Sequence, residues 1–218
     1  ELDAMQCGSR ERFCEAHAIN PNRPILVHIG RIAHEKNIEF LLYVLDRVRD
    51  EFPDVLMVIA GEGPARRSHL RKTAELGLQK NARFVGYLRR GPELWDCFCA
   101  GDAFAFASST ETQGLVLLEA MALGVPVVST AVMGTRDILD AGRGALVAEE
   151  TVEDFTRKVT RLLSDRELRH RLSAEAREYA TEWSAGRNAE RLMEFYDAML
   201  NRYATRSASG DIVADSGN

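Results

Sequence analysis

Two carboxylates flank one short apolar segment and are the residues of this chain best suited to bind a polar ligand. Glu111 and Glu119 stand in the run SSTETQGLVLLEAMALG, which covers residues 108–124. The pattern predicts a strand over 103–107 and a helix that begins near Gly114. The free backbone N–H groups of that helix start would face a phosphate or a sugar hydroxyl beyond the strand. The alternative is purely structural, with hydroxyl residues capping a buried helix and Glu119 as an ordinary helical glutamate.

A second motif places two cations after another predicted strand. The run ILVHIGRIAHEKN over 25–37 holds an apolar strand, then Gly30, Arg31 and, five residues later, Lys36. A strand, a glycine turn and a helix start again make an anion site. Arg31 would clamp a diphosphate through two hydrogen bonds and Lys36 would add a compact charge, so together they would stabilise a leaving nucleoside diphosphate. A solvated basic turn is the alternative interpretation.

Composition limits the class of protein. With 218 residues, of which 45% are hydrophobic and 28% charged, the chain can form one folded domain with tails. A net charge of −5 argues against non-specific nucleic-acid binding. No run approaches about 18 apolar residues and no secretory signal opens the chain, so we expect a cytoplasmic protein. The cysteines lack zinc-site spacing and are expected to be reduced and structural: Cys7, Cys14, Cys97 and Cys99.

The elements that must position these residues follow an alternating pattern. Apolar runs at 25–29, 55–60, 82–84, 103–107, 125–129 and 145–147 predict strands. Amphipathic patterns between them predict helices over 38–50, 65–76, 92–99, 115–123 and 135–141. Three further helices, over 152–163, 165–181 and 185–203, are expected to pack on the flank of the sheet. The predicted fold class is α/β, a Rossmann-like doubly wound parallel six-stranded sheet with flanking C-terminal helices.

The sequence pattern also predicts the domain boundaries. Residues 1–23 are expected to form a linker or N-terminal extension with a short helical piece over 10–17. The folded domain covers 24–203, and the tail over 204–218 is expected to be disordered because it offers little apolar surface to bury. We expect both ends to fray.

Taken together, the motifs resemble the C-terminal half of retaining glycosyltransferases of the GT-B architecture, in the family called group 1 or GT4. The most specific element is the pair Glu111 and Glu119 with seven residues between them, followed by AMALGVPVV. Supporting motifs stand in the same order: GR at 30–31, EKN at 35–37, AGEGP at 60–64 and FVGYL at 84–88. The resemblance covers nearly 24–200 and implies one half of a GT-B fold. The other half, an N-terminal Rossmann-like acceptor domain, is missing, so we expect the isolated chain to be inactive.

The resemblance also implies residue roles. Arg31 and Lys36 become the diphosphate clamps, Glu119 the partner of the ribose hydroxyls and Glu111 a contact to the donor sugar. The backbone near Gly114 would grip the phosphate. The expected donor-binding residues are Gly30, Arg31, Lys36, Tyr87, Leu88, Glu111, Gln113, Gly114, Leu115 and Glu119, with Arg31, Lys36 and Glu111 as the catalytic ones.

A metal-free reaction is expected, because the chain contains no Asp-x-Asp motif and side-chain cations would stabilise the departing diphosphate. No cofactor is expected. The resemblance implies a nucleotide-diphosphate sugar as donor, UDP-sugar ahead of GDP-sugar, a hexose as the transferred sugar and retention at the anomeric carbon. The strand-to-helix run over 61–64 is interpreted as a turn rather than as a ligand contact.

Two departures from the family pattern affect the donor and the acceptor. Gln113 stands where an aromatic residue is usual, and Met133 precedes Gly134 where two glycines are usual. The ETQG variant over 111–114 is similar to that of transferases that glycosylate lipids, so the acceptor reached through the missing domain would be a lipid or a glycan. Basic residues over 157–171 would suit peripheral association with an anionic membrane, although a solvated helix face explains them as well.

Other functions fit part of the pattern. A non-catalytic nucleotide-sugar-binding subunit would need the same donor site. A GT-B-type nucleotide-sugar epimerase would need a further acid/base set, and a phosphorylase would need a pyridoxal-binding lysine; neither is recognisable here. The transferred sugar, the acceptor and the oligomeric state stay open.

Overall fold

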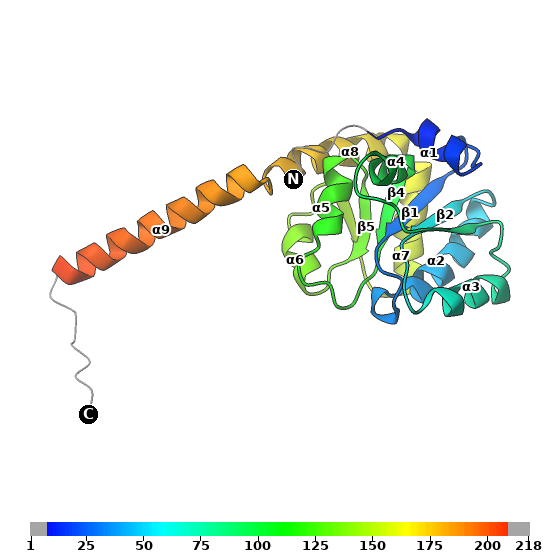
Figure 1. Cartoon of the computed structure of the whole chain (residues 1–218), viewed down its shortest axis with the longest axis horizontal. Helices are drawn as coiled ribbons and strands as arrows, with labels where there is room; N and C mark the ends of the chain where they lie inside the picture. Colours follow the sequence, from blue (N-terminus) through cyan, green and yellow to red (C-terminus); the bar gives the residue numbers. More distant parts are fainter. Residues whose placement is uncertain (1–7, 209–218) are drawn as a thin grey trace, which may run out of the picture.

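The computed structural model describes residues 8–208 and has a six-stranded parallel sheet at its centre (Figure 1). The strands are β1 (Ile25–Ile29), β2 (Leu56–Ala60), β3 (Ala82–Gly86), β4 (Ala103–Phe106), β5 (Val127–Thr130) and β6 (Ala145–Ala148). Their order across the sheet is β3-β2-β1-β4-β5-β6, and every neighbouring pair is parallel. The predicted Rossmann-like doubly wound sheet is confirmed. The predicted start of β5 at 125 is wrong by two residues, consistent with the lack of an N–H on Pro126 for the ladder.

Helices cover both faces of the sheet. One face is covered by α1 (Arg10–Ala16), α4 (Pro92–Ala100) and α5 (Leu115–Ala122). The other face carries α2 (Ile38–Glu51) and α7 (Val152–Ser164), with α3 (Arg66–Glu75) beside α2. The remaining helical elements are η2 (His34–Lys36), α6 (Gly134–Leu139), α8 (Arg166–Thr181) and α9 (Ala185–Ala208). Alternate strand residues therefore enter two separate apolar cores, as expected for a sheet buried on both sides.

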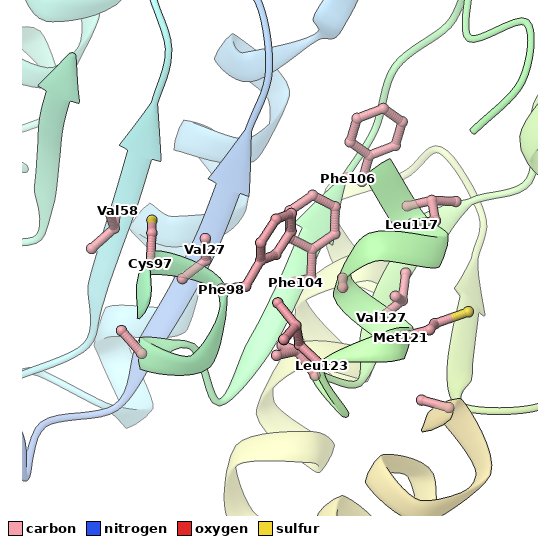
Figure 2. Packing of buried hydrophobic residues seen from close by; sticks show 14 of the residues in the cluster. Val27, Val58, Cys97, Phe98, Phe104, Phe106, Leu117, Met121, Leu123 and Val127 are labelled. Atoms are coloured by element: carbon pink, nitrogen blue, oxygen red, sulfur yellow. The ribbon is translucent and has the colours of Figure 1, made fainter. Parts of the chain in front are cut away.

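The core beneath α4 and α5 is rich in aromatic rings (Figure 2). Phe98 of α4 lies with its ring centroid 5.5 Å from that of Phe104 of β4, and Phe106 continues the stack on the same strand. Leu117 of α5 is fully buried in the same cluster. Each such side chain stabilises the fold by about 1.5–3 kcal/mol through burial. This packing holds α5 firmly against the sheet. The loop between β4 and α5 is therefore fixed in position at its helical end.

The N-terminal helix α1 belongs to the same packed unit. Phe13 and Cys14 are buried in the core beneath α4. Asp96 of α4 accepts hydrogen bonds from the backbone N–H of Ser9 and from the guanidinium of Arg12. Although burial opposes ionisation of Asp96, these donors hold its pKa below the ordinary value. The part of the predicted linker from Ser9 onward is therefore attached to the domain.

The C-terminal helix α9 projects away from the sheet (Figure 1). It runs to Ala208, five residues past the predicted end at 203, so part of the predicted tail is helical. The rest of that tail, 209–218, lies outside the described residues, as does Cys7 in the segment 1–7. Over the part of the helix up to residue 202, where side-chain exposure is described, six large apolar side chains are exposed: Leu192, Met193, Phe195, Tyr196, Met199 and Leu200.

The sheet has a switch point between its two central strands. From β1 the chain continues to β2 on one side, and from β4 it continues to β5 on the other. The loops after β1 and β4 therefore diverge and leave a crevice at the carboxyl edge of the sheet, where ligands bind in doubly wound folds. The two sequence motifs, over 25–37 and 108–124, contribute the loops that border this crevice. Within residues 8–208, none of the helices combines the length and apolarity needed to cross a membrane.

Candidate functional site

The crevice consists of adjoining hollows. One of about 450 Å³ lies beside the ends of β1 and β2 and is lined in part by Tyr87 and Leu88. A second of about 540 Å³ reaches Lys36 and Glu111. Gly30 and Arg31 line both.

The expected donor-binding residues meet here although they come from distant parts of the chain. Nine of the ten line these two hollows or a third one around Glu119, and the backbone N–H of the tenth, Gly114, points at Glu111.

Close backbone packing shapes the floor of the first hollow. A Cβ on Gly61 would lie 1.9 Å from the carbonyl oxygen of Gly30, and Gly61 has φ +136°. Only glycine fits this approach. The run over 61–64 thus serves as the turn between β2 and α3 and supports the Gly30 loop; one of its members, Glu62, also lines the hollow.

Arg31 is exposed at the junction of the two hollows. Among the described residues, no acidic side chain forms an ion pair with its guanidinium. A planar guanidinium in this position offers a fork of N–H donors to an incoming anion.

Hydrogen bonds between two loops bring Lys36 and Glu111 together. The backbone N–H of Ser109 donates to the carbonyl oxygen of Glu35 at 3.1 Å, and the hydroxyls of Ser108 and Ser109 donate to the same oxygen. These hydroxyls therefore join the loop after β4 to the loop after β1 instead of capping α5. The N-cap residue of α5, Gly114, has no side chain to cap the helix, and Leu115 and Val116 of its first turn line the second hollow.

Lys36 and Glu111 form an ion pair in which the Nζ and Oε2 atoms lie 2.8 Å apart. The two side chains are 19% and 18% exposed. The other carboxylate oxygen of Glu111 accepts from the N–H of Gly114 at 3.4 Å. Burial alone would raise the pKa of Glu111, but Lys36 and the N–H groups of Gln113 and Gly114 outweigh it and hold the pKa below its ordinary value. Glu111 is therefore an ionised acceptor rather than a proton donor.

The loop that carries Glu111 rests on a backbone contact. The N–H of Gly134 donates to the carbonyl oxygen of Glu111 at 2.9 Å. A Cβ on Gly134 would lie 2.0 Å from the carbonyl oxygen of Thr112. Met133, the residue that replaces the usual first glycine, has φ +51°, a conformation that is strained for its side chain. The turn therefore retains glycine at position 134, where the backbone of Thr112 leaves no room for a Cβ.

Glu119 is paired with a residue that sequence reasoning did not single out. Nη2 of Arg90 donates to Oε1 of Glu119 at 2.8 Å. The carboxylate side chain is 14% exposed, whereas that of Arg90 is 63% exposed. Both line a third hollow of about 350 Å³, together with Leu115 and Trp183. The signal that could have found Arg90 is its position between the Tyr87-Leu88 run and the start of α4.

A buried histidine lies in the floor next to the Lys36 loop. Nδ1 of His28 lies 3.1 Å from the carbonyl oxygen of Ala105, so it carries the proton of the neutral ring. Burial lowers the pKa of His28 to about 4. Its ring stacks on Phe106, and Nε2 has no hydrogen-bond partner among the described residues. Within 8–208 no group of three or more His, Cys, Asp or Glu side chains is arranged to hold a metal ion.

A doubly wound α/β domain with cations after β1 and two glutamates around the helix after β4 defines a class, the nucleotide-sugar-binding domain. The family model described as "Glycosyl transferases group 1" matches residues 9–179, and the chain belongs to this family. It corresponds to the C-terminal, donor-binding half of GT-B glycosyltransferases.

Curated relatives share its sequence over part of their length. Sulfoquinovosyl transferase SQD2 of Arabidopsis thaliana is 36% identical over 162 residues, which cover 72% of this chain and 30% of the relative. D-inositol 3-phosphate glycosyltransferase of Mycolicibacterium smegmatis is 31% identical over 212 residues, or 94% of this chain and 47% of the relative. The chain thus spans less than half the length of both.

Solved structures share the fold. The C-terminal domain of a glycosyl transferase group 1 family protein (LpcC) from Francisella tularensis matches with a TM-score of 0.72 at 22% identity, over 83% of this chain and 96% of that one. Anabaena HepE in complex with UDP matches with a TM-score of 0.76 at 18% identity, over 87% and 52%. The first of these shows a domain of the same extent.

Proposed function

We propose that this chain is the donor-binding domain of a retaining glycosyltransferase that transfers a hexose from a nucleotide-diphosphate sugar, UDP-sugar ahead of GDP-sugar. The observation that carries the proposal is the convergence of Arg31, Lys36, Glu111 and Glu119 on one crevice at the switch point of the sheet. The likeness to HepE, which was solved with UDP, supports it. Catalysis requires a second domain for the acceptor, so the isolated chain is expected to bind donor without turning it over.

The diphosphate would lie between Arg31 and the start of α5. As the bond from the anomeric carbon to the phosphate breaks, negative charge grows on the leaving diphosphate, and fixed positive groups stabilise it. Arg31 supplies a fork of donors, and the uncapped N–H groups of α5 add their dipole. This arrangement needs no metal ion.

Lys36 can serve the diphosphate without leaving Glu111. An ammonium group has three N–H donors, and the contact with Glu111 at 2.8 Å uses one of them. The remaining donors are available to a phosphate oxygen. Glu111, held ionised by the same contact, accepts a hydroxyl of the donor sugar, so one ion pair binds both sides of the scissile bond.

Glu119 would recognise the ribose. A carboxylate can accept hydrogen bonds from two neighbouring hydroxyls, and these charge-assisted bonds are stronger in a partly dry site. Glu119 is largely buried, as this role requires. The exposed ring of Tyr87 and the buried side chain of Leu88 line the adjoining hollow and would border the base.

The acceptor would be a lipid or a glycan held by an acceptor-binding domain. One of the two curated relatives is named for the sugar group that it transfers and the other for D-inositol 3-phosphate, so family membership alone does not select an acceptor. Two residues of the basic face proposed for membrane association have structural partners. Arg157 pairs with Asp154, and Arg169 donates to the carbonyl oxygens of Leu162 and Leu163. A solvated face accounts for these residues.

Calorimetric titration of UDP, GDP and ADP, with and without magnesium, tests the proposal. We expect UDP to bind without magnesium and to bind more tightly than its 2′-deoxy analogue. Glu119→Gln should remove that preference for ribose, whereas Glu167→Gln, a change at an exposed position on α8, should leave it intact. Absence of binding by all three nucleotides would contradict the proposal, and an unchanged ribose preference in Glu119→Gln would remove the role of Glu119.

A further inference from the structure

We propose that Arg90 is a specificity-determining residue. In the donor-free protein it forms an ion pair with the ribose-binding carboxylate of Glu119, and the ribose hydroxyls of the donor replace it there. The proposal rests on the proposed function, because it takes Glu119 as the group that binds ribose. It assigns a role to Arg90 in the loop between β3 and α4, whereas the residue roles described above include only Tyr87 and Leu88 of that loop.

The ion pair joins two separate segments across the crevice. Arg90 stands in the loop after β3, and Glu119 lies in the middle of α5. Arg90 lines both the 450 Å³ hollow, with Arg31 and Tyr87, and the 350 Å³ hollow, with Glu119 and Trp183. A nucleoside whose base lies near Tyr87 and whose ribose reaches Glu119 must therefore pass the guanidinium.

The burial of the two partners makes the contact exchangeable. A carboxylate as buried as that of Glu119 needs a charged or hydrogen-bonding partner, because an unpaired buried charge is unfavourable. Arg90 is mostly exposed and loses little hydration when it binds or leaves. Pairs with one solvated partner contribute about 0–1 kcal/mol. Arg90 thus supplies a charged partner for the carboxylate, and two ribose hydroxyls are able to replace it.

The backbone next to Arg90 allows this movement. Gly91 follows it with φ +127°, and a Cβ placed there would meet no heavy atom within 4 Å. Pro92 then begins α4, so the start of the helix is fixed on the other side of this glycine. The side chain of Arg90 is itself 63% exposed, so it can exchange its contact with Glu119 for water or for a ligand.

The ion pair should therefore lower the apparent affinity for ribonucleotides but not that for 2′-deoxynucleotides. A ligand with both ribose hydroxyls must break the pair before it binds Glu119. Its apparent affinity is therefore the intrinsic affinity multiplied by the fraction of molecules in which the pair is open. A 2′-deoxy ligand makes a poorer replacement and leaves Arg90 in place. From the strength of such pairs we expect the penalty on UDP to be about twofold to fivefold.

Titration of UDP and 2′-deoxy-UDP into Arg90→Gln tests the proposal, with Arg89→Gln as the matched control. Arg89 is the neighbouring arginine of the same loop, 89% exposed and paired with Glu93 rather than with Glu119. Both variants remove one positive charge from the same loop. Relative to Arg89→Gln, we expect Arg90→Gln to bind UDP about twofold to fivefold more tightly and 2′-deoxy-UDP equally well.

The possible outcomes separate this proposal from the function on which it rests. Weaker UDP binding by Arg90→Gln than by Arg89→Gln, or an equal change for both ligands, would overturn the role of Arg90 alone. A ribose preference that survives in Glu119→Gln would overturn the role of Glu119 and with it that of Arg90. Stronger binding of UDP alone supports both.

Discussion

The two glutamates of the crevice are each held by a cation at 2.8 Å, yet the two ion pairs are built differently. In the pair of Lys36 and Glu111 both partners are mostly buried, and hydrogen bonds through Glu35 join their loops. In the pair of Arg90 and Glu119 the carboxylate is buried but the cation is solvated. Equal distances therefore do not imply equal roles. The burial of the cation distinguishes a permanent structural contact from one that a ligand can replace.

The largest expected effect comes from breaking the support of the Glu111 loop. In Gly134→Ala the new Cβ would meet the carbonyl oxygen of Thr112 at 2.0 Å, so the loop must move. We expect the free energy of unfolding to fall by about 3 kcal/mol and UDP binding to be lost. Chemical denaturation and calorimetry measure both.

Gly186→Ala is the control, because a Cβ at Gly186 meets nothing within 4 Å. Near-normal stability of Gly134→Ala would mean that the loop beside Lys36 adapts and that the pair of Lys36 and Glu111 is not rigid.

Acid should destabilise the Lys36 side of the crevice through His28. Its pKa is about 4 in the folded protein, below the ordinary 6.5, so the unfolded chain binds a proton first as the pH falls. The stability that His28 contributes is complete above pH 6.5 and is lost towards pH 4, by about 2–3 kcal/mol. Denaturation of wild type and His28→Leu at pH 7 and pH 4.5 checks this.

We expect the loss on acidification to be smaller in His28→Leu and unchanged in His170→Gln, which alters an exposed histidine on α8. An equal loss in wild type and His28→Leu would show that other groups carry the acid sensitivity.

Removal of the Lys36 charge should leave Glu111 buried without its main partner. We expect Lys36→Met to lower the free energy of unfolding at pH 7 by about 1–2 kcal/mol, less than for a fully buried pair because some solvent reaches it. The pKa of Glu111 is depressed in the folded protein, so the stabilisation is present above its ordinary value of 4.5 and is lost as the pH falls further. The difference between wild type and Lys36→Met should therefore shrink near pH 3.5. A difference that does not depend on pH would point to lost packing of the lysine stem.

The smallest effect is expected for the exchangeable pair. Arg90→Gln should change the free energy of unfolding at pH 7 by less than about 1 kcal/mol, because the guanidinium is solvated. Thermal or chemical denaturation beside Lys36→Met makes the comparison direct. A loss in Arg90→Gln as large as that in Lys36→Met would contradict the distinction between the two pairs.

Much of the fold and the crevice could be predicted from the sequence. Apolar runs alternating with helical patterns identify all six strands, because a strand buried on both faces leaves a continuous apolar signal. The same order of elements brings the residues after β1 and β4 to one edge of the sheet. The assignment of Arg31, Lys36, Glu111 and Glu119 to one donor site comes from the resemblance to group 1 glycosyltransferases.

The partners of these residues could not be predicted, because they depend on side chains that meet across loops. Nothing local links Glu119 with Arg90, or Lys36 with Glu111, which lie 75 residues apart. His28 appears in the sequence as one polar residue within a buried strand, and only the position of Ala105 on the neighbouring strand reveals its tautomer. The extent of α9 was also missed, since its last turn extends into the polar composition that predicted a tail.

Calorimetric binding of UDP and uridine to wild type and to Arg31→Ala tests the donor-site assignment most directly. Arg31 has no acidic partner among the described residues, so its change should affect the diphosphate and little else. We expect UDP affinity to fall about 10-fold to 100-fold and uridine affinity to stay unchanged, with Arg67→Ala on α3 as the control. Equal losses for UDP and uridine, or no loss for either, would contradict a diphosphate site at the end of β1.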